Sequence, residues 1–98
     1  MSKNIYVQEE FVNESEGYRL GDSDVFESRF TSKSEAWKHY RREYGRCISK
    51  VYIGEDKPIG WVFQKLVKYT DCNEKYLQSA WVTLHAAPPV RSIEYNYL

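Results

Sequence analysis

The sequence predicts one α+β domain, in which an antiparallel β-sheet of about four strands carries one α-helix, at about residues 33–44, packed on one face. One segment repeats aromatic side chains at helical spacing, and two later segments joined by a short polar stretch are rich in strand-forming residues. The chain has 98 residues, of which 42% are hydrophobic and 16% aromatic. This composition supports one core and is too apolar for a disordered chain.

The first 30 residues form the less regular part of the expected domain. Asn4 to Val12 is a candidate strand, whereas Glu14 to Asp24 has the charged and small residues of a loop. Val25 to Phe30 then leads into the helix and supplies apolar anchors. We therefore expect this segment to contribute one strand to the sheet.

The clearest element is a helix from Lys33 to Tyr44. Ser32 and Ser34 are both candidate N-caps, and Glu35 follows Ser32 at the spacing of a capping box. Gly45 suits the position after the last helical residue. The spacing predicts an aromatic side that docks on the sheet and a basic side that faces solvent or a ligand. The aromatic side carries Ala36, Trp37, Tyr40 and Tyr44, and the basic side carries Lys38, Arg41 and Arg42.

Three strands are expected after the helix. Cys47 to Ile53 forms the first and ends at a polar turn. Ile59 to Thr70 and Tyr76 to His85 form a hairpin that closes through the loop Asp71–Glu74. Symmetric closure pairs Tyr69 with Tyr76, Phe63 with Val82 and Trp61 with Leu84, and it places Val62, Leu66, Leu77 and Trp81 together on the other face.

The chain after the hairpin begins with Pro88 and Pro89, which interrupt the sheet because proline lacks a ladder donor. Residues 88–98 are predicted to form a C-terminal edge strand or tail. Both faces of the hairpin carry large apolar side chains, and one helix can cover only one face. We expect part of the second face to be covered by the N-terminal segment, the C-terminal tail, a second copy of the chain or a foreign partner.

The sequence contains no arrangement of residues typical of catalysis. The histidines and cysteines (His39, His85, Cys47 and Cys72) lack metal-ligand spacing, and the five glycines match no phosphate-binding loop. We therefore expect no enzyme, catalytic residue, metal or cofactor. The two cysteines favour reduced thiols in a cytoplasmic protein, since no signal peptide is recognised. No apolar run is long enough to span a membrane, so no membrane partner is expected.

Charge is balanced overall but unevenly distributed along the chain. Residues 1–30 hold three basic and seven acidic side chains, whereas residues 31–57 hold seven basic and four acidic ones. Overall neutrality argues against a dedicated nucleic-acid binder. The basic stripe Lys38, Arg41 and Arg42 nevertheless makes a small nucleic-acid-binding module the alternative function.

Aromatic residues are unusually frequent, with nine tyrosines and three tryptophans in one small domain. These residue types are enriched at binding interfaces, and they also fill cores. Tyr69, Tyr76 and Trp81 are predicted to be sheet-borne contacts for a partner, and Lys38, Arg41 and Arg42 a charged contact face.

The segment from Ser34 to Leu84 reads SEAWKHYRREYG, then GWVFQKLVKYTD, then EKYLQSAWVTL. It resembles small proteins encoded by bacteriophages and their bacterial hosts, through a hairpin pattern that covers about half the chain. The resemblance implies an accessory protein in the cytoplasm of a bacterial host and carries over no site residues. Some phage proteins of this size inhibit a host enzyme or a defence complex.

The leading functional expectation is a non-enzymatic, phage-encoded binding protein that engages a host protein or protein complex. An uncovered apolar face or an edge strand can also pair with itself, so a homodimer remains open.

Overall fold

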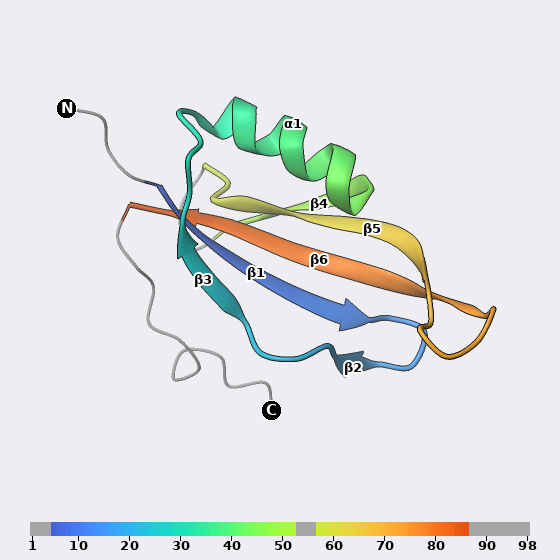
Figure 1. The fold of residues 1–98 in the computed structure, drawn as a ribbon. Helices are drawn as coiled ribbons and strands as arrows, with labels where there is room; N and C mark the ends of the chain where they lie inside the picture. The colour runs from blue at the N-terminus through green and yellow to red at the C-terminus, as the bar shows by residue number, and fades with distance from the viewer. Residues whose placement is uncertain (1–4, 53–56, 87–98) are drawn as a thin grey trace.

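The computed structural model describes residues 5–52 and 57–86, and it confirms an α+β fold with one helix packed on an antiparallel sheet (Figure 1). The strands are joined in the order β2-β1-β6-β5-β4, and β3 also pairs with β1. The predicted C-terminal strand or tail at 88–98 lies outside the described residues. The elements are β1 (Tyr6–Asn13), β2 (Tyr18–Arg19), β3 (Asp24–Glu27), α1 (Lys33–Tyr44), β4 (Arg46–Val51), β5 (Gly60–Lys68) and β6 (Lys75–His85).

The sheet has six strands instead of about four because the first 30 residues supply three of them. β1 lies in the interior of the sheet and pairs with β6 along its whole length, from Tyr6 opposite His85 to Asn13 opposite Gln78. The short strands β2 and β3 pair with its other side. The strand pattern of β1 is weak in the sequence because polar residues occupy both of its faces: Gln8 and Glu10 lie on the face without the helix, and Glu9 and Asn13 lie on the face with it.

Helix α1 matches its predicted bounds, and its ends explain why. The hydroxyl of Ser32 accepts a hydrogen bond from the Glu35 amide at 3.2 Å, so Ser32 is the N-cap. The Glu35 carboxylate accepts hydrogen bonds from Thr31, which hold the pKa of Glu35 below its usual value. Gly45, at φ +99°, ends the helix where a Cβ would collide with the Gln64 carbonyl oxygen.

One position on the helix differs from the prediction. Ala36 and Tyr40 are buried against the sheet and Tyr44 is half-buried, but Trp37 is 36% exposed. Residues 36, 40 and 44 follow one another at four-residue spacing, whereas residue 37 is rotated by about 100° from residue 36. The buried stripe is therefore narrower than predicted, and Trp37 lies at its edge.

The hairpin of β5 and β6 forms as predicted, but its register is wrong by two residues. Phe63 lies opposite Ala80 and Trp61 opposite Val82. The Tyr69 amide donates to the Glu74 carbonyl at 3.0 Å, so the loop begins one residue earlier than expected. An even shift keeps every side chain on its predicted face.

The core lies between α1 and one face of the sheet. Phe63 is fully buried there, and the ring of Tyr40 stacks on that of Tyr44 with centroids 5.2 Å apart. The Tyr44 hydroxyl donates to the Glu9 carboxylate at 2.9 Å, which gives this buried acid a partner on the helix. The remaining buried members of the core are Val7, Ala36, Trp61, Ala80, Val82 and Leu84.

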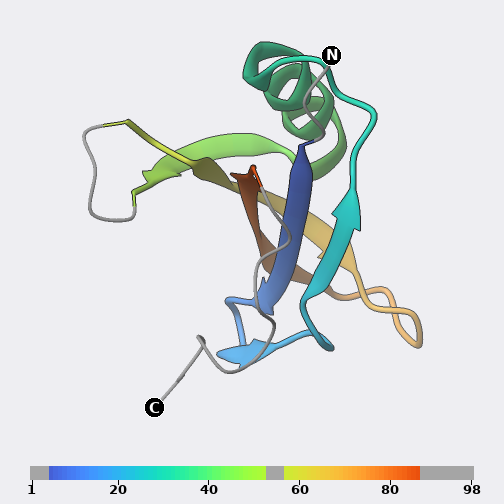
Figure 2. The same cartoon turned by 90° about the vertical axis from the view of Figure 1, so that its left-hand side faces the viewer.

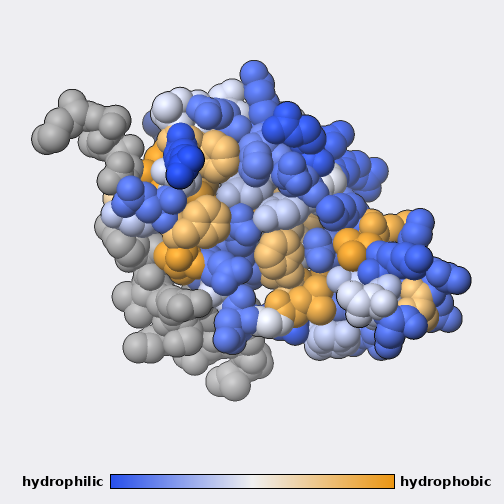
Figure 3. Space-filling view, viewed as in Figure 1, coloured by the Kyte–Doolittle hydropathy of each residue, from blue (hydrophilic) through white to orange (hydrophobic). Residues whose placement is uncertain are grey.

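The sheet is bent, so the face away from α1 is concave (Figure 2). Gly60 in β5 permits close strand contact, because a Cβ there would collide with the Val82 carbonyl oxygen. A β-bulge interrupts β4 between Cys47 and Ser49. The bulge keeps Cys47 packed on the core while the side chain of Val51 reaches the concave face. In the view of Figure 3, hydrophilic side chains cover α1 and apolar groups gather in patches along the strands.

Candidate functional site

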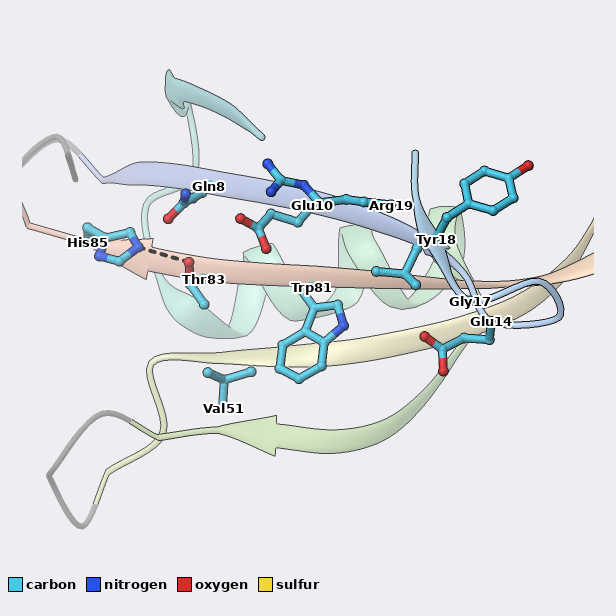
Figure 4. Close-up of a pocket in the computed structure, with 11 residues that line it drawn as sticks. Gln8, Glu10, Glu14, Gly17, Tyr18, Arg19, Val51, Trp81, Thr83 and His85 are labelled. Carbon is cyan, nitrogen blue, oxygen red and sulfur yellow. Dashed lines mark hydrogen bonds between the residues drawn. The ribbon is translucent and has the colours of Figure 1, made fainter. Parts of the chain in front are cut away.

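The concave face carries a trough of about 520 Å³, and this is the candidate site (Figure 4). We call trough the hollow lined mainly by Gln8, Glu10 and Val12 of β1, Trp81 and Thr83 of β6, and Val51 of β4. All of these side chains project from the sheet face opposite α1, because alternate residues of a strand point to opposite faces. The helix therefore leaves this face available.

The floor of the trough is formed by cross-strand pairs of β1 and β6. Glu10 lies opposite Trp81, and Gln8 lies opposite Thr83. The Trp81 side chain is 43% exposed even though β6 is an interior strand of the sheet. A large ring on an interior strand is normally covered, so this exposure marks Trp81 as the main apolar contact that the trough offers.

One end of the trough is polar and internally hydrogen-bonded. The amide nitrogen of Gln8 donates to the Ser23 hydroxyl at 2.7 Å, and both residues are buried. The Thr83 hydroxyl lies 2.8 Å from Nε2 of His85. These contacts hold the end of the trough in shape.

The other end is built by the turn between β1 and β2, which places Glu14, Tyr18 and Arg19 along the trough (Figure 4). The Glu14 amide donates to the Leu77 carbonyl at 2.7 Å, and the Leu77 amide donates to the Ser15 hydroxyl at 2.9 Å. The turn is therefore attached to β6. Figure 4 shows the Arg19 side chain extending along β1 toward Glu10.

Asn13 anchors this turn to the tip of the β5–β6 hairpin. Its side chain is fully buried, and its amide nitrogen donates to the Tyr69 hydroxyl at 3.2 Å. The Tyr69 hydroxyl donates to the Glu16 carboxylate, and this hydrogen bond raises the pKa of Tyr69. The Glu16 amide donates back to the Asn13 side chain at 3.0 Å. This network positions Tyr18 at the end of the trough.

The structure does not gather the six predicted contact residues into one surface. Trp81 lies in the trough, whereas Tyr69 and Tyr76 contact each other near the hairpin tip, with ring centroids 4.8 Å apart. Tyr76 lies opposite Val67, on the sheet face that carries Phe63. Lys38, Arg41 and Arg42 are exposed on α1. Their role in binding remains a prediction.

Sequence reasoning missed the trough residues on β1, β2 and β4, among them Glu10, Tyr18 and Val51. The signal in the sequence was that successive side chains of β1 point to opposite faces of the sheet. This alternation identifies trough residues only when the pairing of β1 with β6 is known. Because about 70 residues separate these strands in the sequence, local patterns do not reveal the pairing.

The described residues contain no ready-made metal centre. Within 5–52 and 57–86, no three His, Cys, Asp or Glu side chains lie close enough together to hold a metal ion. Cys47 and Cys72 are free thiols, half-buried and exposed respectively. The His39 ring packs against Phe30 and Tyr40. Over the same ranges, no helix combines the length and apolar composition needed to cross a bilayer.

Comparison with known proteins adds no assignment to this geometry. No family model matches the chain, and no significant match is found among curated proteins or solved structures. The functional proposal is therefore argued from the trough and the residues that line it.

Proposed function

We propose that this chain is a non-enzymatic binding protein that docks a host protein, either an enzyme or a defence complex, in the trough. The supporting observation is Trp81, a partly exposed indole at the centre of a hollow of about 520 Å³. Tryptophan is the residue type that most often dominates the binding energy of an interface, and it does so from the centre of a pocket. A phage origin and action in the host cytoplasm belong to the proposal through the resemblance described above.

Capture of partners from a bacterial host lysate, followed by mass spectrometry, tests the proposal when two tryptophan variants are compared. Trp81→Ala removes the indole from the trough, and Trp37→Ala removes a similarly exposed indole from the helix. We expect the wild-type chain and Trp37→Ala to retain one partner that Trp81→Ala loses. With the purified partner, Trp81→Ala should weaken affinity by about 30-fold or more, the size of an interface hot spot. A partner that is captured equally by both variants would contradict docking in the trough.

The alternative function, nucleic-acid binding, is supported by Lys38, Arg41 and Arg42, which are exposed on α1. Reversal of charge in the double variant Arg41→Glu/Arg42→Glu should abolish binding to DNA or RNA if this helix contacts phosphates. Wild-type affinity should also fall steeply between 50 and 200 mM salt, because phosphate contacts release counterions. Electrophoretic mobility shifts at several salt concentrations measure both effects. Affinity that survives the double change rejects this alternative.

Self-association through the trough is a third arrangement that the same face allows. Light scattering of the 11.7 kDa chain at high concentration measures it directly. A molar mass of two copies that falls to one copy in Trp81→Ala would identify a second copy as the occupant. A strict monomer counts against self-association.

A further inference from the structure

We propose that residues 90–97 of this chain fold back along the trough and cover Trp81 when no partner is bound. This occupant goes beyond the proposed function, because it concerns the protein without its partner. Three observations support it: the point at which the chain leaves the sheet, the side-chain pattern of the segment that follows, and the length of the trough.

The described chain leaves the sheet at one end of the trough. β6 ends at His85, and the side chains of Thr83 and His85 line that end (Figure 4). Pro88 and Pro89 follow shortly afterwards. Because proline has no amide proton for the ladder, the chain cannot continue as a strand between β1 and β5. It therefore has to leave the sheet, and the trough begins where it does so.

The segment 90–97 has the pattern of an extended chain with one apolar side. Alternate side chains of an extended chain point to opposite sides. The apolar members of this alternation are Ile93, Tyr95 and Tyr97, and the polar members are Ser92, Glu94 and Asn96. The apolar side matches the trough, where Trp81 is partly exposed and Val12 and Val51 lie in the lining.

The segment is long enough to follow the trough. The floor runs along β1 from Gln8 to Glu14, about 20 Å at the rise of a strand, and an extended chain from residue 90 to residue 97 spans about 23 Å. Trp81 lies four residues before His85, about 13 Å from that end. With residue 90 level with His85, the apolar side chains nearest Trp81 are therefore those of Ile93 and Tyr95.

Attachment to the same chain makes a weak contact sufficient. Only a short linker separates His85 from residue 90, so the effective concentration of the segment at the trough is of the order of a millimolar. A contact with a dissociation constant of about 1 mM then covers the trough in about half of the molecules. A partner that docks there has to displace the segment, which lowers the partner's apparent affinity about twofold.

Quenching of tryptophan fluorescence by acrylamide tests the proposal on the full chain. The measurement is made in a Trp37→Phe background, which retains Trp61 and Trp81. Because Trp61 is only 7% exposed, quenching in this background reports the accessibility of Trp81.

Two tail variants are compared in this background. Ile93→Ser/Tyr95→Ser/Tyr97→Ser removes the apolar side of the segment and should raise the quenching constant about twofold, since the trough would no longer be covered in half of the molecules. Ser92→Ala/Glu94→Gln/Asn96→Ala changes the other side and is the matched control. It should leave the quenching constant unchanged.

The outcomes identify the occupant. Equal quenching constants in the background chain and both tail variants overturn the proposal. A quenching constant of the background chain that rises on dilution means that a second copy supplies the segment, which overturns the intramolecular arrangement. Nuclear Overhauser effects between the Trp81 indole and the ring of Tyr95, undiminished on dilution, would support it directly. No partner takes part in these measurements, so a failure of the proposed function, seen as partner capture that ignores Trp81→Ala, leaves their result unchanged.

Discussion

Replacement of Phe63 by alanine should lower the free energy of unfolding by about 3–5 kcal/mol. Phe63 is fully buried between β5 and the helix layer, and its ring contacts that of Trp61 with centroids 6.1 Å apart. Alanine would leave a cavity that the surrounding strands cannot fill, because β5 is held by β4 on one side and β6 on the other. Urea denaturation followed by circular dichroism measures the change.

Leu66→Ala is the matched control for this variant. Leu66 lies three residues further along the same strand, on the opposite face, and is 65% exposed. Its replacement should change the free energy of unfolding by no more than about 0.5 kcal/mol. Equal losses in the two variants would mean that α1 does not cover the Phe63 face in solution.

The stability of the domain should fall as pH rises above about 10, the ordinary pKa of tyrosine. Burial, and then the neighbouring Glu9 carboxylate, raise the pKa of the Tyr40 and Tyr44 hydroxyls in the folded state. The unfolded chain therefore loses these protons first, and each added pH unit favours unfolding. The free energy of unfolding should fall by up to about 1.4 kcal/mol per pH unit for Tyr40, which is 2% exposed. The contribution of Tyr44 should be smaller, because its side chain is half-buried and solvent screens its charge.

Urea denaturation between pH 9 and 11.5 checks this dependence. Tyr40→Phe should flatten the alkaline decline, because phenylalanine has no proton to lose. Tyr52→Phe serves as the control, since Tyr52 is 52% exposed. If Tyr40→Phe and the control decline as steeply as the wild type, the hydroxyl of Tyr40 is not protected beneath the helix as the structure describes.

The elements defined by neighbouring residues were predicted well from the sequence. Helix α1 is specified by Ser32, the spacing of Ala36 and Tyr40, and Gly45, all of which act within a few residues of one another. The faces of the β5–β6 hairpin are likewise set by alternation, so Trp81 and Leu66 are exposed on the side predicted for them. The register of the hairpin was missed because a shift of one residue in its loop moves every pair by two.

The amino-acid sequence by itself determined the α+β class, the helix with its basic outer side, and the surplus of apolar residues on the second face of the hairpin. Only the tertiary structure decided that β1 is an interior strand and that Glu10 lies opposite Trp81. It also decided that β2 and β3 pair with β1 on one side of the sheet while β4 forms the opposite edge. The physical reason is distance along the chain: helical periods and caps act over a few residues, whereas the trough needs strands from both ends of the chain to pair.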